Sequence, residues 1–305
     1  MPALNKPLIT VLTPAYNRAE QLKALFASLQ KQSDPDFCWL VVDDGSQDST
    51  KEVVQTFQKE VRFPLEYVWK ENGGKHTAIN RALPSINTPL VFIVDSDDTL
   101  TPDAIQTIKE TYALYGSETD LCGFSFLRQK PDGGLLSEGK VPQDGMKASF
   151  VDCRLKGGIG GDMAEVWLTK RLQEFPFPEF KGEKFLSEDV VWIPMARKYQ
   201  MRFFNQAIYL SDYQADGLTR NRRAHNIASP NGCVYRAEIL MGDELDFKSR
   251  AKGALQYVVY GRFANRSLPD LLASTKHRGL VSLALLPGLV LQARWKKQYP
   301  LKSDK

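Results

Sequence analysis

Histidine and cysteine are scarce in this 305-residue chain, and each scarcity excludes a class of site. The chain has three histidines, His76, His225 and His277. They are too few for a histidine-rich metal site and argue against a Ser-His-Asp centre. The four cysteines are far apart and include no CxxC pair, which argues against a disulfide framework or a zinc knuckle. We therefore expect carboxylates to perform any acid–base chemistry.

The N-terminal sequence MPALNKPLITV also lacks a long apolar stretch behind a basic head. This predicts a protein without a secretory signal that remains in the cytoplasm. With 43% hydrophobic and 25% charged residues, the composition is that of an ordinary globular protein that can bury a sizeable core.

Strand and helix patterns alternate clearly in the first half of the sequence. Each short β-rich run is followed by apolar residues at helical spacing, as in Leu22, Leu25 and Leu29 after the first run. This alternation predicts an α/β fold, a doubly wound and mostly parallel sheet with helices on both faces. The four expected strands are Leu8–Thr13, Cys38–Val42, Leu65–Trp69 and Leu90–Val94.

The pattern loosens after about Leu121. We expect a strand at Met163–Leu168, a helix over FLSEDVVWIPMARKY and another strand at Arg202–Leu210. These elements predict an elaborated second half of the same domain, which binds the acceptor. The sequence thus predicts a catalytic domain over residues 1–221 and a helical C-terminal extension over residues 222–305.

Polar clusters follow each expected strand, where parallel sheets bind their ligands. Asp95, Asp97 and Asp98 come directly after LVFIV, and three acids so close together repel unless a cation or donors neutralise them. Carboxylates suit Mg²⁺ or Mn²⁺, which commonly completes its coordination with substrate phosphates. An acidic turn that caps the next helix would explain one of these acids, but not three.

Other polar residues near the strand ends have two interpretations each. Asp44 can hydrogen-bond a ribose or base, or belong to a common DDG turn; Tyr16 can stack on a base, or simply pack. Gly73-Gly74-Lys75 can approach a phosphate, or form a plain glycine turn.

Five motifs together resemble family 2 glycosyltransferases of the GT-A fold. They are ITVLTPAYNR, VVDDGSQDST, ENGGKHTAIN, VFIVDSDDTL and SEDVVW, in that family's order and spacing, and they cover Pro7 to about Asn221. Within the family, the chain resembles the bacterial enzymes of saccharide assembly. We expect it to be non-processive, because the QxxRW signature of processive members is missing. The resemblance implies an inverting transfer from a nucleotide-diphosphate sugar, with UDP the expected nucleotide, to a saccharide or lipid-linked acceptor.

The resemblance also implies which residues bind the donor. The loop after the first strand would line the nucleobase pocket, and Asp44 would bind the base or ribose. Asp95-Ser96-Asp97 would be the DxD element, with Asp95 near the ribose and Asp97 on a Mn²⁺ or Mg²⁺ ion that bridges the diphosphate. The implied nucleotide-binding set is Pro14, Tyr16, Asn17, Arg18, Asp44, Gly74, Lys75, Asn80, Asp95 and Ser96, and the implied metal ligands are Asp97 and Asp95.

Glu188-Asp189 matches the family's acidic pair, of which one carboxylate removes the proton of the acceptor hydroxyl. We expect Asp189 to be this base, with Glu188 in reserve; a plain helix start capped by Ser187 is the alternative. One departure concerns Ile79, which stands where many members carry arginine, with Arg81 two places later. The sequence therefore does not identify which residue of this motif contacts the diphosphate.

Other functions share some of these features. A sugar-phosphate nucleotidyltransferase also uses paired carboxylates, but it has a glycine-rich loop after its first strand, and TPAYNR has no glycine. A dinucleotide-binding oxidoreductase is excluded because GxGxxG is missing. A non-catalytic nucleotide-sugar-binding subunit stays open, since spacing does not prove turnover. No nucleic acid is expected as a partner, because the basic residues are not interleaved with aromatic ones.

The C-terminal part is strongly basic. Residues 248–305 contain twelve Lys or Arg and two acids, a net charge of +10, which leaves −6 for the rest of this +4 chain. Residues 279–293 are uncharged but shorter than the about 20 residues that span a bilayer, and Pro287-Gly288 is expected to break a helix there. The segment suits an anionic membrane surface, or packing on the enzyme body or on a partner chain.

Overall fold

The computed structural model describes residues 6–211 and 222–299. The chain divides into two compact units, one formed by Met1–Pro176 with Met195–Tyr213 and one by Phe177–Pro194 with Gln214–Lys305. The expected domain boundary at residue 221 lies outside the described residues. Residues 177–194, which include the SEDVVW motif, belong to the same unit as the C-terminal helices.

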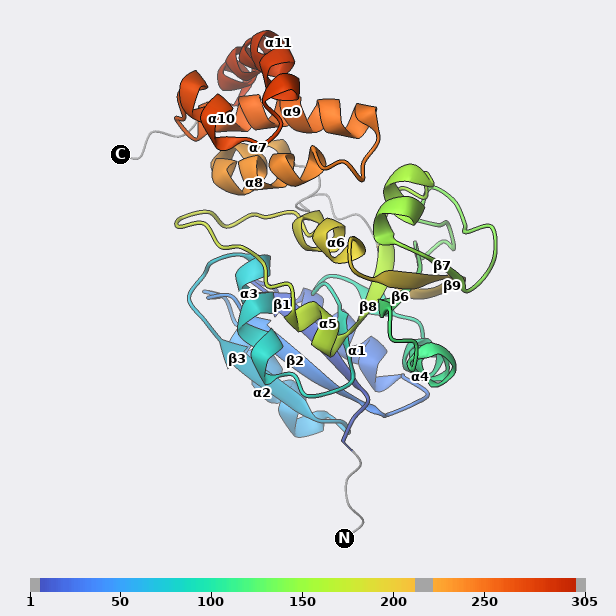
Figure 1. The fold of residues 1–305 in the computed structure, drawn as a ribbon. Helices are drawn as coiled ribbons and strands as arrows, with labels where there is room; N and C mark the ends of the chain where they lie inside the picture. The colour runs from blue at the N-terminus through green and yellow to red at the C-terminus, as the bar shows by residue number, and fades with distance from the viewer. Residues whose placement is uncertain (1–5, 212–221, 300–305) are drawn as a thin grey trace. The chain divides into compact units, whose positions relative to one another are not determined.

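A curled sheet forms the first unit (Figure 1). Among the described residues it has nine strands in the order β3-β2-β1-β4-β8-β6-β9-β5, with β7 paired to β9. The strands are β1 (Ile9–Ala15), β2 (Phe37–Asp43), β3 (Leu65–Trp69), β4 (Leu90–Ile93), β5 (Thr99–Leu100), β6 (Leu121–Gln129), β7 (Met146–Ala148), β8 (Met163–Leu168) and β9 (Gln200–Leu210).

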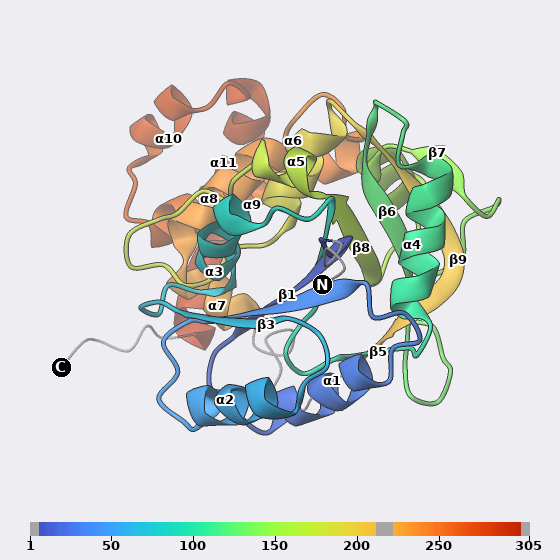
Figure 2. The same cartoon turned by 90° about the horizontal axis from the view of Figure 1, so that it is seen from below.

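The helices of this unit follow the alternation that the sequence predicts. Figure 2 shows α1 and α2 along one face of β1 and β3, with α3 on the opposite face. The expected α/β fold with helices on both faces is confirmed. The helical segments are α1 (Gln21–Gln30), α2 (Thr50–Glu60), α3 (Lys75–Ala82), η1 (Leu83–Ser85), α4 (Ala104–Tyr115), η2 (Val151–Lys156), α5 (Thr169–Gln173) and α6 (Asp189–Ala196), the last of which begins in the second unit.

Burial explains why the first strands are continuous apolar runs. β1 is the centre of the parallel part: it pairs with β2 and β4, and all seven of its residues are buried. Phe26 of α1 and Phe57 of α2 stack on Trp39 of β2, whose indole N–H donates to Thr13 Oγ1 over 3.0 Å. This packing brings the carboxyl ends of β1 to β4 to one edge, where the polar motifs begin.

The looser pattern after Leu121 comes from a change of strand direction. β8 lies antiparallel between β4 and β6, whereas β6 runs parallel to β9. The register between β6 and β9 shifts three times, so β6 does not repeat the regular βα pattern.

Over residues 222–299, the C-terminal part of the second unit is helical. Its helices pack around a core that includes Ile227, Val234, Tyr257, Leu271 and Val281. They are α7 (Arg222–Ala228), α8 (Pro230–Leu240), α9 (Phe247–Phe263), α10 (Leu268–Ser274) and α11 (Arg278–Gln298).

The expected helix break at Pro287-Gly288 is wrong, because α11 continues through both residues. Gly288 lies against α9 so closely that a Cβ there would be 2.6 Å from Val258 Cγ1. Tight packing on α9 thus compensates for the backbone hydrogen bond that Pro287 cannot donate. No helix in the described ranges is both long and apolar enough to cross a bilayer.

We expect Trp39→Ala to lower the free energy of unfolding by about 3–5 kcal/mol, because it removes a fully buried ring that packs against both α1 and α2. Trp69→Ala is the matched control: Trp69 is 57% exposed at the end of β3, so its loss should cost less than about 1 kcal/mol. Urea unfolding followed by circular dichroism measures both. Equal losses would contradict the central place of Trp39.

Candidate functional site

The loop after β1 is fastened to the loop after β2. Asn17 N donates to Ser46 Oγ over 2.8 Å, and Gln47 N donates to Asn17 Oδ1 over 2.8 Å. Arg18 N donates to Thr50 Oγ1 over 3.0 Å. Asn17 adopts a φ of 53°, a left-handed conformation that asparagine tolerates. These bonds fix the backbone of the predicted nucleobase loop.

Two residues of this loop differ in exposure. Pro14 is buried within β1, whereas Tyr16 directly after β1 is 44% exposed. The Tyr16 ring is therefore accessible for stacking, while Pro14 shapes the strand end.

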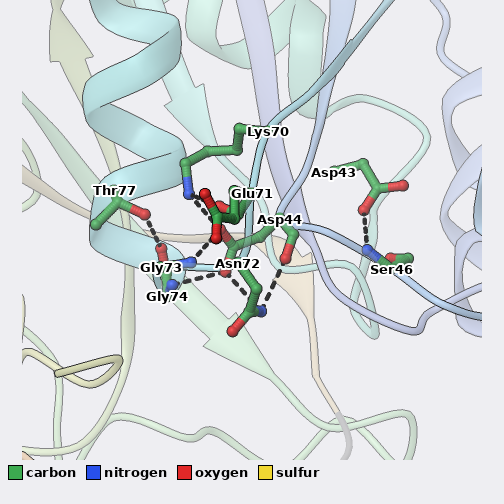
Figure 3. Close-up of polar contacts among 9 residues, drawn as sticks. All are labelled: Asp43, Asp44, Ser46, Lys70, Glu71, Asn72, Gly73, Gly74 and Thr77. Atoms are coloured by element: carbon green, nitrogen blue, oxygen red, sulfur yellow. Dashed lines mark hydrogen bonds and ion pairs between the residues drawn. The ribbon is translucent and has the colours of Figure 1, made fainter. Parts of the chain in front are cut away.

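Asp44 is enclosed by donors from the segment after β3, as Figure 3 shows. Its Oδ1 accepts from Lys70 Nζ at 2.6 Å and from Gly73 N at 2.9 Å. Its Oδ2 accepts from Gly74 N at 2.6 Å and from Asn72 Nδ2 at 3.2 Å. Both oxygens of this buried carboxylate thus hold the NGG segment in place.

Gly74 is required by this arrangement. It has a φ of 97° and is the residue before the first turn of α3, a conformation that disfavours any side chain. The structure therefore gives Asp44 and Gly74 a shared role that was not expected, because Asp44 positions the loop from which Lys75 and α3 begin. Asn80 lies on α3, half-buried.

The acidic loop after β4 is surrounded by basic side chains from three other elements. Lys75 Nζ lies 2.5 Å from Asp95 Oδ1, and Arg128 Nη1 lies 3.8 Å from Asp95 Oδ2. Arg18 Nη2 approaches Asp97 Oδ2 at 3.9 Å. Burial raises the pKa of Asp95, but the charges of Lys75 and Arg128 outweigh it, and the pKa is lowered overall. Asp95 is therefore ionised at neutral pH.

Tyr209 of β9 holds this loop from within the sheet. Its hydroxyl accepts from Asp95 N at 2.9 Å and donates to Asp98 Oδ2 at 2.9 Å. The Arg128 guanidinium lies over the Tyr209 ring, 4.0 Å from its centroid, and its Nε donates to Met163 O at 2.6 Å. Burial, together with the charge of Asp95, raises the pKa of Asp98 to about 7.

The acids of this loop differ in their surroundings. Ser96 and Asp98 are buried, whereas the Asp95 and Asp97 side chains are 31% and 24% exposed. Within residues 6–211 and 222–299, no group of three or more His, Cys, Asp or Glu residues is arranged to hold a metal ion by itself. Two partly exposed carboxylates fit an ion such as Mg²⁺, which is bound by one or two carboxylates together with substrate phosphates.

Lys75 is the residue of α3 that brings a positive charge to the acidic loop. The Ile79 side chain is fully buried, and Arg81 is exposed at the end of α3. Lys75, at the first residue of α3, instead reaches the acidic loop.

Asp189 in the second unit is held by Arg236 of α8. Arg236 Nε lies 2.7 Å from Asp189 Oδ1 and 2.9 Å from Oδ2, and its Nη2 lies 2.5 Å from Oδ2. Arg236 Nη1 also donates to Gln256 Oε1 at 3.2 Å, which fixes the guanidinium. Burial raises the pKa of Asp189, but the Arg236 charge outweighs it, and the pKa is lowered overall. Glu188 precedes this residue, and its carbonyl accepts from Val191 N at 2.9 Å.

Comparisons with known proteins identify the family. The sequence profile described as Glycosyl transferase family 2 matches residues 10–124. The GalNAc(5)-diNAcBac-PP-undecaprenol beta-1,3-glucosyltransferase of Campylobacter jejuni is 32% identical over 266 residues, which are 83% of this chain and 82% of that protein. The chain belongs to glycosyltransferase family 2.

Other members match over shorter regions. The putative teichuronic acid biosynthesis glycosyltransferase TuaG of Bacillus subtilis is 30% identical over 155 residues, 48% of this chain. The chain spans only 60% of TuaG and 46% of the putative glycosyltransferase EpsH of the same species.

Solved structures agree on the fold. Staphylococcus aureus TarS 1-349 in complex with UDP-GlcNAc has a TM-score of 0.57 at 19% identity, covering 95% of this chain and 80% of that one. The mannosyltransferase PcManGT of Pyrobaculum calidifontis, in complex with GDP-Man and Mn²⁺, has a TM-score of 0.55 at 18% identity, covering 97% and 88%. The expected GT-A fold is confirmed.

Several site residues of this family 2 chain were not predicted from the sequence, among them Arg128, Tyr209 and Arg236. Each of these three contacts a predicted acid across a long separation, 111 residues between Asp98 and Tyr209 and 47 between Asp189 and Arg236. The only indication in the sequence was the group Asp95, Asp97 and Asp98, because three carboxylates so close together need basic or hydrogen-bond-donating partners from other parts of the fold.

We expect Asp44→Asn to lower the free energy of unfolding by about 3 kcal/mol, because it removes the buried carboxylate that pairs with the half-buried Lys70. Asp34→Asn is the control: this carboxylate also meets a lysine, Lys109, but the lysine side chain is 41% exposed, so the loss should stay below about 1 kcal/mol. Urea unfolding measures both. An Asp44→Asn variant as stable as the wild type would contradict the holding role of this carboxylate.

Proposed function

We propose that this chain transfers a sugar from a UDP-sugar to a hydroxyl group of a saccharide or lipid-linked acceptor, with inversion at the anomeric carbon, in cell-surface polysaccharide assembly. Membership of family 2 supports a glycosyl transfer. The observation that carries the proposal is the convergence of Arg18, Lys75 and Arg128 on the acidic loop after β4. Relatives named for teichuronic acid biosynthesis and for a PP-undecaprenol-linked substrate support the acceptor class.

The basic side chains suit the diphosphate of the donor. Lys75 and Arg128 are both paired with Asp95, so their charges are directed at one point. A diphosphate bound there would accept hydrogen bonds from the same ammonium and guanidinium groups. As the bond to the sugar breaks, negative charge grows on the departing diphosphate, and preorganised cations stabilise it.

A divalent ion, Mn²⁺ or Mg²⁺, fits the two partly exposed carboxylates of this loop. Asp97, with Asp95, would hold it, and the diphosphate would supply the other ligands. When bound, the ion would act as a Lewis acid that stabilises the leaving diphosphate. The Mn²⁺ in the PcManGT complex supports this proposal.

The nucleoside is proposed to lie against the loop after β1. Tyr16 offers an exposed ring for the base, and the contacts of Asn17 with the β2 loop keep that ring in place. Asp44 contributes by holding Gly73 and Gly74, and so sets the position of Lys75. The complex of TarS with UDP supports uridine as the nucleoside.

Asp189 is proposed as the base that removes the proton of the acceptor hydroxyl. As the proton moves to its carboxylate, the hydroxyl oxygen forms a bond to the anomeric carbon, and the bond from that carbon to the diphosphate oxygen breaks. Arg236 keeps Asp189 ionised and oriented. A single base opposite the leaving group gives direct displacement and therefore inversion.

The place of action is proposed to be the cytoplasm, at the cytoplasmic face of a membrane when the acceptor is lipid-linked. The PP-undecaprenol in the name of the Campylobacter relative supports this location.

We expect Asp97→Asn to remove the part of UDP affinity that depends on Mn²⁺, because the substitution removes a charged metal ligand. Isothermal titration calorimetry with and without MnCl₂ measures it. Asp103→Asn has the same change of charge six residues away on an exposed side chain, and it should keep the full response to Mn²⁺. Unchanged Mn²⁺-dependent affinity in Asp97→Asn would refute the metal role of this residue.

We expect Asp189→Asn to keep UDP binding but to lose transfer, because it removes only the proton acceptor. Release of UDP from the donor in the presence of a saccharide acceptor measures transfer. Glu188→Gln is the matched variant and should keep most of the activity. If Asp189→Asn were active and Glu188→Gln inactive, the base would be Glu188.

The variant Arg236→Gln tests the role of Asp189 through the pH dependence of kcat/KM. Without the guanidinium, only the Ser187 hydrogen bond and the charge of Arg222 oppose the effect of burial on Asp189, so its pKa rises. The base works only when ionised, and the acidic limb of the kcat/KM profile therefore moves to higher pH. A uniform loss of activity at every pH would show that Arg236 has only a structural role.

A further inference from the structure

Helix α11 presents an apolar face that no described residue covers. Leu283, Leu286 and Val290 are 79%, 73% and 64% exposed, and their spacing of three and four residues aligns them on one side of the helix. The opposite side, with Val281 and Gly288, packs on the α9 side of the helical core. The exposed face is therefore separate from the packing that holds α11 in the unit.

This face is long and free of charge. Arg278 and Arg294 are the charged residues that bound it, and none lies between them. At 1.5 Å per residue, the uncharged part of the helix is about 22 Å long. Large apolar side chains repeated along one exposed face are uncommon on a soluble protein unless they meet a partner.

The charges at the ends of this face have one sign. Arg278 begins α11, and Arg294, Lys296 and Lys297 lie in its last turns, all of them exposed. The helix contains no acidic residue. An apolar strip with cations at both ends complements a surface with an apolar interior and anionic head groups.

A second copy of the chain fits this face poorly. In a symmetric pair through α11, either relative direction of the two helices brings basic ends together without an acid to pair them. Crossing the bilayer is also not indicated, because neither α11 nor another helix of the described chain is long and apolar enough.

We propose that α11 lies flat in the interface of an anionic lipid membrane, with Leu283, Leu286 and Val290 among the acyl chains and the terminal basic residues among the head groups. This inference rests on the proposed action at a membrane face, and it names the surface that makes the contact. Such a contact would bring a lipid-linked acceptor and the enzyme to the same surface.

Vesicle flotation with the full chain tests the inference. We expect the wild type to float with vesicles of phosphatidylcholine and phosphatidylglycerol, and Leu283→Gln/Leu286→Gln/Val290→Gln to lose about 100-fold in partition coefficient. Leu114→Gln, which changes a leucine of α4 that is 72% exposed, is the matched control and should bind as the wild type does. Thermal unfolding checks that each variant is folded.

A second pair of variants tests the charge. Arg294→Gln/Lys297→Gln should weaken binding to the anionic vesicles by about 30-fold, because each basic residue near the surface contributes about 1 kcal/mol. Lys51→Gln/Lys59→Gln removes the same charge from exposed positions of α2 and should leave binding unchanged. Vesicles of phosphatidylcholine alone should bind the wild type more weakly.

Two outcomes would overturn the inference. One is wild-type flotation that the triple substitution does not reduce. The other is a dimer in analytical ultracentrifugation that the triple substitution dissociates, since α11 would then bind a second copy. UDP binding by calorimetry separates this inference from the proposed function: retained UDP binding without flotation removes only the membrane contact, and flotation without UDP binding removes only the glycosyl transfer.

Discussion

The first unit depends on how the charges of the acidic loop after β4 are balanced. Asp95, Asp97 and Asp98 lie within four residues, and their mutual repulsion is met by Lys75 from α3, Arg128 from β6 and Arg18 from the β1 loop. Tyr209 adds a hydroxyl that bonds both ends of the loop. Distant parts of the sheet thus converge on one point, where three basic side chains meet the acidic loop.

A second layer of contacts fixes these charged groups in position. Asp44 holds the NGG segment, which places Lys75 at the start of α3, and the Asn17 contacts fix the loop that carries Arg18. In the second unit, Arg236 does the same for Asp189. Cations that are positioned in advance stabilise the developing charge without a cost of reorganisation.

The sequence predicted the parts of this arrangement that depend on local patterns. The alternating apolar runs predicted β1 to β4 and their helices, and the motifs placed Asp95 and Asp97 at a strand end. It did not predict Arg128, since LRQ at the end of β6 resembles any strand end, or Tyr209, whose partner is 111 residues away. The break expected at Pro287 was wrong because packing of Gly288 on α9 overrides the local preference. Pairing across the fold has no local signature.

A crystal structure with UDP and Mn²⁺ tests the central claim most directly. Our interpretation predicts the ion beside Asp97 and the diphosphate in contact with Lys75 and Arg128, both at the carboxyl end of β4. A nucleotide bound elsewhere, or an acidic loop whose carboxylates keep their basic partners and bind no ion at saturating UDP and Mn²⁺, would contradict it.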